Sequence, residues 1–338
     1  MLTQIQTPIA NDLQRYAEVF RQTLHSDNEL LEAALAHVTR RLGKMMRPTL
    51  VLLCARQGSN GVTDEVLHVA AGLEMLHTAS LVHDDVVDES DMRRGQRSVN
   101  AVFDNKAAVL VGDFMTSKAL SEIAKTHNLE VVQRMAWLGQ TLADGELEQL
   151  SNTNLTTFSQ DAYYSVISKK TAALFSTCAY VGALLGGADS ATVTSLERFG
   201  HIVGLCFQMR DDIFDFDETL NVGKPKGNDM QEGKLTLPVL FAVGAKPASH
   251  STPSVSPASK TELEHFRRLA LKVRCHEAAR FEVQELVDFT IRAGGVAYAE
   301  LEMRRMRDEA LSLLTPLPDQ NIANILRMYL DFVVERNS

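Results

Sequence analysis

Two short acidic motifs of the same pattern are the residues in this sequence best suited to chemistry. Both read Asp-Asp-x-x-Asp, and each follows a long apolar stretch. The acids are Asp84, Asp85 and Asp88 in "HDDVVD", and Asp211, Asp212 and Asp215 in "RDDIFD". On a helix, positions four apart share one face, so the first and last acid of each motif point together. Like charges at that spacing repel, and no lysine stands three or four residues away to offset them.

The repeated pattern favours binding of a hard divalent cation. A single copy has a plain alternative, a solvated helix end, but two copies that each end an apolar helix disfavour it. Carboxylate oxygens are the ligands that Mg²⁺ prefers, and Mg²⁺ often bridges protein acids to the phosphates of a substrate. Calcium is disfavoured because the sequence lacks the EF-hand loop pattern.

Basic residues near both acidic motifs and near the N-terminus are suited to phosphate oxygens, which arginine forks and lysine point charges bind. They are Lys44 and Arg47 in "GKMMRP", Arg93 and Arg94 in "MRRG", Lys169 and Lys170 in "SKKT", and Lys224, Lys226 and Lys234 in "VGKPKGNDMQEGKLTLP". Any one of these lysines alone could be a solvated surface charge. As a set they predict two anionic groups, one bridged by metal and one held by bases directly. The last stretch is not a P-loop, because Leu235 stands where Ser or Thr is required.

Helices must position these residues, because helical periodicity dominates the chain and alternating strand patterns are scarce. Apolar residues recur every three or four positions over 11–40, 64–87, 105–126, 129–150, 160–186, 194–217, 262–274, 277–294, 296–314 and 319–335. The sequence therefore predicts one all-α domain spanning residues 1–338. The Ser/Pro-rich stretch 245–260 is expected to be a disordered loop between two helices.

Composition narrows the class of protein further. The chain has 338 residues and a net charge of -9, so nucleic acid and anionic membrane surfaces are not expected partners. The four cysteines are scattered, which fits a reducing cytoplasm rather than a disulfide framework or a zinc site. Neither a signal peptide nor a membrane span is expected. The longest uncharged run, 171–188, is rich in small residues and reads as a closely packed buried helix.

The ordered set of motifs resembles the trans-polyprenyl diphosphate synthases, the class I isoprenyl synthases. The resemblance rests on "GKMMRP", "HTASLVHDDVVDESDMRRG", "SKKTA", "FQMRDDIFDF" and "GKPKGNDMQEGKLTLP", and it covers residues 40–240. The family's first motif normally begins Gly-Gly-Lys, whereas Leu42 replaces the first glycine here. The resemblance implies an all-α bundle around a deep central cavity, a homodimer, and head-to-tail condensation of isopentenyl diphosphate onto an allylic diphosphate such as farnesyl diphosphate.

The resemblance also implies a role for each motif residue. Two or three Mg²⁺ ions would be held by Asp84, Asp88, Asp211 and Asp215, with Asp85 and Asp212 tuning the coordination. The departing diphosphate would be gripped by Arg93, Lys170, Lys234 and Lys224. Isopentenyl diphosphate would be held without metal by Lys44, Arg47, His77 and Arg94. Thr171 and Gln208 would turn oxygen dipoles toward the developing carbocation. The stretch 144–149, "DGELEQ", either lines the cavity or forms a solvated face.

Small side chains before the first acidic motif favour a long product. Ala79 and Ser80 stand where short-chain members carry bulky aromatics, and Ala79 lies about 7.5 Å along the helix from Asp84. The cavity floor is then expected deeper, at Ile123 and Met135, although core packing explains both residues equally well. Octaprenyl diphosphate for a quinone side chain is the favoured product. The alternatives are a farnesyl or geranylgeranyl synthase, a non-catalytic subunit of a heteromeric synthase, a class I terpene cyclase, or a helical scaffold that binds metal for structure.

Overall fold

The computed structural model describes residues 1–40, 43–152, 157–216, 227–248, 251 and 256–336. Contacts divide the chain into two compact units. The first unit comprises Met1–Ala136, Thr177–Glu197 and Pro316–Leu326, and the second comprises Trp137–Ser176, Arg198–Thr315 and Arg327–Ser338. Several boundaries between the units fall inside helices. A single domain over residues 1–338 stays a prediction.

Helices make up nearly all of the regular structure in the described residues, as the periodicity predicts. From the N-terminus to the first acidic motif they are α1 (Leu2–Gln6), η1 (Thr7–Ile9), α2 (Ala10–Thr23), α3 (Glu29–Thr39), α4 (Met46–Ala55) and α5 (Asp64–Val87). The middle of the chain forms α6 (Val99–Phe103), α7 (Asn105–Ala124), α8 (Leu129–Asn152), α9 (Gln160–Ile167), η2 (Ser168–Ala172), α10 (Ala173–Leu185) and α11 (Ser190–Phe214). The remainder forms α12 (Asn228–Gln231), α13 (Leu237–Ala242), α14 (Lys260–Arg274), α15 (Arg280–Arg292), α16 (Gly295–Leu314) and α17 (Gln320–Glu335).

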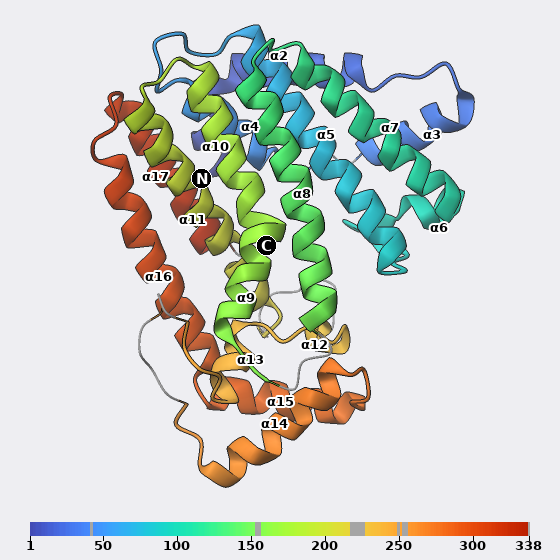
Figure 1. Ribbon diagram of the computed structural model, residues 1–338, viewed down its shortest axis with the longest axis vertical. Coiled ribbons are helices and arrows are strands. Elements are labelled where there is room, and N and C mark those ends of the chain that lie inside the picture. Colours follow the sequence, from blue (N-terminus) through green and yellow to red (C-terminus); the bar gives the residue numbers. More distant parts are fainter. Residues whose placement is uncertain (41–42, 153–156, 217–226, 249–250, 252–255, 337–338) are drawn as a thin grey trace. The chain divides into compact units, whose positions relative to one another are not determined.

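Helix α5 is the central element of the first unit and packs against α2, α4 and α7 (Figure 1). Within its first half, all residues over 66–75 except His68 are buried, which is typical of a helix enclosed by others. Gly72 allows α7 to come close, since a Cβ there would lie 3.0 Å from Ile123 Cγ1 and 3.1 Å from the Ala119 carbonyl oxygen. The apolar half thus anchors α5, and its last turn carries the first acidic motif.

The continuous helical pattern over 11–40 is interrupted in the structure. Helix α2 ends at Thr23, and α3 begins only at Glu29. Asn28 is the N-cap of α3, and its side-chain oxygen accepts a hydrogen bond from the Leu31 N–H at 3.0 Å. Because a capped helix start satisfies N–H groups that a continuous helix would use internally, the prediction of one helix here was wrong.

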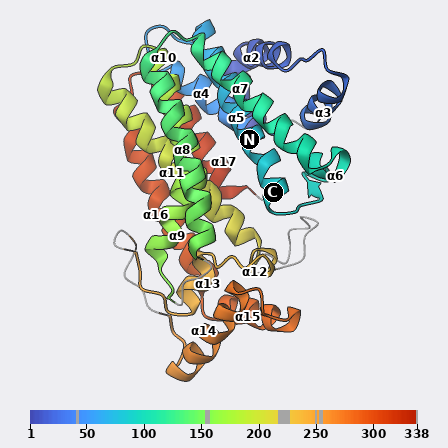
Figure 2. The same ribbon diagram turned by 45° about the vertical axis from the view of Figure 1, so that its right-hand side comes forward.

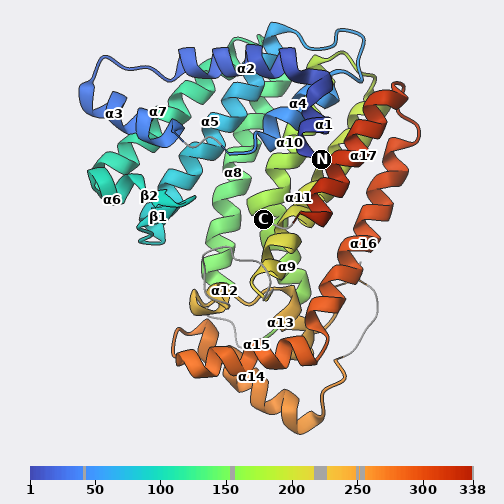
Figure 3. The same cartoon turned by 180° about the vertical axis from the view of Figure 1, so that it is seen from behind.

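A two-stranded hairpin follows the first acidic motif, where the sequence showed no strand pattern. Strands β1 (Met92–Arg93) and β2 (Gln96–Arg97) pair antiparallel, and Figure 3 shows them beside the end of α5. Arg94 and Gly95 form the turn with positive φ angles of 51° and 73°. Type I′ turns require both central residues in this region. Arg93 and Arg94 are adjacent in sequence, but Arg93 belongs to strand β1 and Arg94 to the turn.

The long helix predicted over 160–186 contains an irregular turn. Residues Ser168–Ala172, "SKKTA", form a π-helical turn between α9 and α10. Such turns are rare and occur frequently at functional sites, because they re-aim side chains without ending the helix. Here the turn carries Lys169, Lys170 and Thr171.

Helices α13 to α15 enclose a hydrophobic core in the second unit, and Figure 2 shows α14 and α15 side by side. Phe266 and Phe289 stack at its centre with ring centroids 3.7 Å apart. Part of the loop predicted over 245–260 lies outside the described residues. In the described part of this loop, Ser256 is buried and donates a hydrogen bond to the Ala242 carbonyl oxygen at 2.9 Å. No described helix is both long and apolar enough to cross a membrane.

Candidate active site

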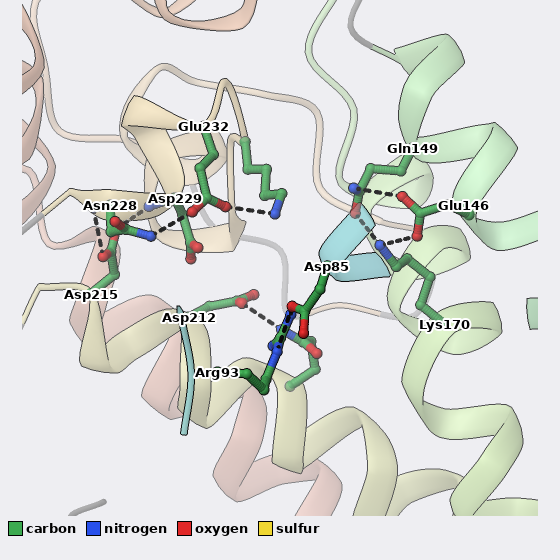
Figure 4. A network of polar contacts seen from close by, with 12 residues as sticks. Asp85, Arg93, Glu146, Gln149, Lys170, Asp212, Asp215, Asn228, Asp229 and Glu232 are labelled. Atoms are coloured by element: carbon green, nitrogen blue, oxygen red, sulfur yellow. Dashed lines mark hydrogen bonds and ion pairs between the residues drawn. The ribbon is translucent and has the colours of Figure 1, made fainter. Parts of the chain in front are cut away.

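The first acidic motif forms the end of α5. Asp84 is half-buried, Asp88 is exposed at the C-cap, and the Asp88 N–H donates to the Asp84 carbonyl oxygen at 2.8 Å. The helical spacing that would bring Asp84 and Asp88 together is therefore present. Asp85 is buried and pairs with Arg93, whose Nε donates to Asp85 Oδ1 at 2.8 Å. Arg93 thus neutralises the middle acid in this structure (Figure 4).

His83, the residue before the motif, fixes the last turn of α5 against α7. Its Nε2 lies 3.1 Å from the Val109 carbonyl oxygen and 3.5 Å from Asp113 Oδ1. Gly112 makes room for the ring, because a Cβ there would lie 2.1 Å from His83 Nε2. This contact orients the turn that presents the acids.

The residues assigned to isopentenyl diphosphate meet in the first unit. A Cβ on Gly43 would lie 3.1 Å from Arg94 Nη1, so the Arg94 guanidinium lies directly over the backbone next to Lys44. Arg47 and Arg94 both act electrostatically on His77. Met45, between the two basic residues of "GKMMRP", has a φ of 52°. A non-glycine residue held in the left-handed region is strained, and such strain clusters at functional sites.

A buried glutamate, which sequence reasoning missed, lies beside this basic group. Glu74 precedes His77 by one helical turn on α5 and is 7% exposed. Burial raises the pKa of its carboxyl, although Arg47 and Arg94 partly oppose the shift. Burial also lowers the pKa of His77 well below its ordinary value, and the nearby Arg47, Arg94 and Arg93 lower it further. His77 is therefore a neutral imidazole at pH 7 and can donate one N–H to an anion.

A hydrogen-bonded chain in the second unit joins three predicted residues. Thr171 Oγ1 donates to Gln208 Oε1 at 2.8 Å, and Gln208 Nε2 donates to Asp212 Oδ1 at 3.0 Å. Tyr163, which sequence reasoning missed, donates its hydroxyl to Asp212 Oδ2 at 2.6 Å. The π-helical turn and α11 are thereby tied together at the residues expected to face the carbocation.

Two carboxyls of the second acidic motif have raised pKa values, because they are buried beside other acids. Burial raises the pKa of Asp212 to about 8, with Asp229 and Asp211 adding to the shift. Burial likewise raises the pKa of Asp215 to about 6, again with a contribution from Asp229. Asp229 is a further acid that sequence reasoning did not single out. A divalent cation beside these carboxyls would favour their ionised form, and carboxylate oxygens are donors that such a cation prefers.

Asp215 also accepts backbone hydrogen bonds from the first residues of α12. Its Oδ1 accepts the Asn228 N–H at 2.8 Å and its Oδ2 accepts the Asp229 N–H at 3.2 Å, so it holds the start of α12 (Figure 4). Its role as a metal ligand stays a prediction. Within the described residues, no group of three or more His, Cys, Asp or Glu side chains is placed to hold a metal ion.

Lys170 is held by the "DGELEQ" stretch of α8. Its Nζ forms an ion pair with Glu146 and donates to Gln149 Oε1 at 3.0 Å (Figure 4). Gly145 permits this approach, because a Cβ there would lie 3.1 Å from Lys170 Cγ and 2.7 Å from Lys169 Cβ. This stretch is therefore in contact with a predicted diphosphate-binding residue. Lys234 pairs with Glu232 at 2.7 Å, and Lys224 lies outside the described residues.

The residues predicted to set product length are mostly buried. Ala79, Ile123 and Met135 are 1%, 2% and 3% exposed, and Ser80 donates to the His77 carbonyl oxygen at 2.9 Å. Ile123 packs at Gly72, twelve residues before Asp84 and about 18 Å along α5 at 1.5 Å per residue. Burial alone fits both a cavity wall and ordinary core packing.

Comparisons with known proteins agree with the motifs. The model of the family Polyprenyl synthetase matches residues 28–266. Octaprenyl diphosphate synthase of Haemophilus influenzae is 39% identical over 247 residues, covering 72% of this chain and 74% of that protein. The crystal structure of geranylgeranyl pyrophosphate synthase from Bacteroides thetaiotaomicron has a TM-score of 0.82 at 40% identity and covers 99% of both chains. Polyprenyl synthase from Caulobacter crescentus, solved with calcium and isoprenyl diphosphate, has a TM-score of 0.88 at 27% identity and covers 100% of this chain and 98% of that one.

These matches confirm the predicted all-α class and the predicted enzyme class. The family match spans both acidic motifs and the basic stretches between them. The chain belongs to the polyprenyl synthetase family and is a trans-prenyltransferase that acts on prenyl diphosphates.

Proposed function

We propose that this protein catalyses Mg²⁺-dependent head-to-tail condensation of isopentenyl diphosphate onto an allylic diphosphate, with farnesyl diphosphate as the favoured primer. The observation that carries the proposal is the pair of Asp-Asp-x-x-Asp motifs, each formed at the end of a helix and each accompanied by bases suited to diphosphate. The Caulobacter crescentus relative, solved with calcium and isoprenyl diphosphate, supports a divalent cation and this class of substrate.

The basic group of the first unit is suited to isopentenyl diphosphate. Lys44 is exposed, and the Arg94 guanidinium lies over Gly43 next to it. His77, neutral at pH 7, would add one N–H to the charge-assisted bonds from Lys44, Arg47 and Arg94. Glu74, one turn before His77 on α5, acts electrostatically on Arg94. This substrate would thus be held by bases without a metal.

The allylic substrate would be held by the acids together with a second set of bases. Asp84, Asp88 and Asp211 would hold the Mg²⁺ ions, with Asp215 completing the set. When bound, the cation offsets the charge that develops on the departing diphosphate. Lys170 would exchange Glu146 for a phosphate oxygen, and Arg93, which pairs with Asp85, would grip the same diphosphate. Lys224 and Lys234 would join the same group.

Thr171 and Gln208 would stabilise the allylic carbocation. Gln208 Oε1 accepts the Thr171 hydroxyl, and its amide is fixed by Asp212. Both dipoles are therefore oriented before the reaction, which is the condition under which electrostatic stabilisation costs no reorganisation.

We propose a long-chain product, with octaprenyl diphosphate favoured and a quinone side chain as its use. Ala79 offers little bulk close to Asp84, and Ile123 at Gly72 is far enough along α5 to be a floor, with Met135 as a second floor residue. The Haemophilus influenzae relative is named for octaprenyl diphosphate. The Bacteroides thetaiotaomicron structure, named for geranylgeranyl pyrophosphate, makes a shorter product the competing candidate.

We further propose a cytoplasmic homodimer. Large apolar side chains of the first unit are exposed on α7 and at the start of α8, among them Leu110 at 67%, Leu120 at 56% and Leu129 at 70%. Apolar surface of this kind is typical of an interface between subunits, and a second copy of the chain is the partner that the family resemblance implies.

An incorporation assay with the purified protein tests the proposal. With Mg²⁺, isopentenyl diphosphate and farnesyl diphosphate, we expect steady incorporation of labelled isopentenyl units into prenyl products. Chelation of the cation should abolish incorporation, and added Mg²⁺ should restore it. Incorporation that continues in excess chelator would contradict the cation role, and no incorporation at all would favour the non-catalytic subunit.

A further inference from the structure

The last described residue of the chain lies on the second acidic motif. Arg336 follows α17, and its Nη2 donates to Asp211 Oδ1 at 2.6 Å and to the Phe207 carbonyl oxygen at 2.9 Å. All three residues belong to the second unit. A contact between positions 125 residues apart thus places a permanent positive charge on the first acid of the motif.

The Arg336 side chain is largely buried and packs against aromatic rings. Its guanidinium lies over the Phe207 ring at 3.8 Å and near the Phe214 ring at 5.5 Å, and the side chain is 10% exposed. Arg210 Nε donates to the Arg336 carbonyl oxygen at 3.0 Å, which ties down the backbone as well. Nevertheless, Arg336 Nε is buried and lacks an acceptor among the described residues. The guanidinium is therefore well placed but incompletely satisfied.

The position of Arg336 opposes the approach of a cation to Asp211. A guanidinium on Oδ1 occupies an oxygen that a metal would use, and its positive charge repels a second cation in this half-buried setting. A cation that arrives with diphosphate meets less repulsion, since the phosphate charge offsets that of the guanidinium. We therefore expect Asp211 to bind a cation that carries diphosphate more readily than a bare cation.

We propose that Arg336 is the internal counter-cation of the second acidic motif, competes with divalent cations for Asp211, and so favours loading of the cation together with diphosphate. The proposal rests on the metal-binding role proposed for Asp211. It assigns the C-terminal end of α17 a part in the reaction, because competition is reciprocal: a cation complex that engages Asp211 must weaken the hold on Arg336.

Binding of Mg²⁺ alone to the full-length protein is the direct test. Isothermal titration without diphosphate should show Mg²⁺ binding at least about tenfold tighter in Arg336→Gln than in wild type, equivalent to about 1.4 kcal/mol. Arg336→Lys keeps the charge and should stay close to wild type. Unchanged or weaker Mg²⁺ binding in Arg336→Gln would overturn the proposal.

Arg307 supplies a matched control. Its Nη2 pairs with Asp331 Oδ1 on α17 at 2.6 Å, but neither residue belongs to an acidic motif. Arg307→Gln therefore removes a comparable arginine–aspartate pair from the same helix and should leave Mg²⁺ affinity unchanged. A tenfold gain in this variant too would show that loosening α17, not uncovering Asp211, is responsible.

A double-mutant comparison separates this proposal from the proposed function. Asp211→Asn should weaken Mg²⁺ binding, and adding Arg336→Gln to it should produce no tightening. If the gain persists without the Asp211 charge, Arg336 does not act through Asp211. If Asp211→Asn itself leaves Mg²⁺ binding unchanged, the metal role of Asp211 is wrong.

Hydrogen exchange of the wild-type protein tests the proposal without any substitution, should Arg336→Gln fail to fold. Mg²⁺ with inorganic pyrophosphate should increase amide exchange in the last turn of α17, while pyrophosphate alone should not. Unchanged or slower exchange on addition of both would contradict displacement of Arg336.

Discussion

Asp84→Ala and Asp211→Ala are each expected to lower prenyl-transfer turnover by several orders of magnitude while the fold stays intact. Each acid begins one of the two motifs, and its carboxylate is proposed to hold the cation that offsets the charge of the leaving diphosphate. Such an offset contributes several kcal/mol to the transition state, and about 1.36 kcal/mol corresponds to a tenfold change in rate. The measurement is the steady-state rate at saturating Mg²⁺ and saturating substrates.

Asp64→Ala is a matched control for the first of these variants. Asp64 lies at the opposite end of α5 and forms an exposed ion pair with Arg15 at 2.8 Å. Its loss removes the same charge from the same helix and should cost less than about 1 kcal/mol of stability, with turnover close to wild type. Near-normal turnover in Asp84→Ala or Asp211→Ala, with Mg²⁺ in excess, would contradict the mechanism.

Ala79→Tyr is expected to shorten the product sharply, toward farnesyl or geranylgeranyl diphosphate. Ala79 is buried on α5, about one and a half turns from Asp84, where the growing chain is proposed to pass. A phenol ring there would block the path while the acids and the first condensation remain. The measurement is product length by chromatography, together with the initial rate of isopentenyl diphosphate consumption, which should change less than length.

Stability must be measured alongside, since overpacking a buried site costs about 1–3 kcal/mol. A melting curve distinguishes a destabilised helix from a blocked path, and Ala79→Ser, which adds a single oxygen, should keep the parent product. A folded, active Ala79→Tyr enzyme that still makes the parent product would show that α5 does not border the chain at this position.

The structural features that were predictable from the sequence are those that depend on local residue pattern. Helix α5 has the bounds that its apolar periodicity predicts, and the acids at its end follow directly from that assignment. The break before Asn28 and the π-helical turn at "SKKTA" were not predictable in this way, because apolar spacing continues through both. Caps and irregular turns depend on a few polar contacts that periodicity does not record.

The partners of the site residues were also beyond sequence reasoning. Tyr163 on Asp212, Glu146 on Lys170 and Arg336 on Asp211 join positions far apart in the chain. No spacing rule relates such residues, since tertiary packing alone brings them together. Glu74 lies only one turn before His77 in the sequence. A lone acid on a largely apolar helix nevertheless has no distinguishing pattern until its arginine neighbours are located.

Sizing the products of the wild-type enzyme tests the central claim most directly. Purified full-length protein would be incubated with Mg²⁺, farnesyl diphosphate and excess isopentenyl diphosphate, and the dephosphorylated products separated by reversed-phase chromatography. We expect an all-trans series in which the octaprenyl product dominates at completion. A reaction that stops at geranylgeranyl diphosphate with isopentenyl diphosphate still in excess would contradict it.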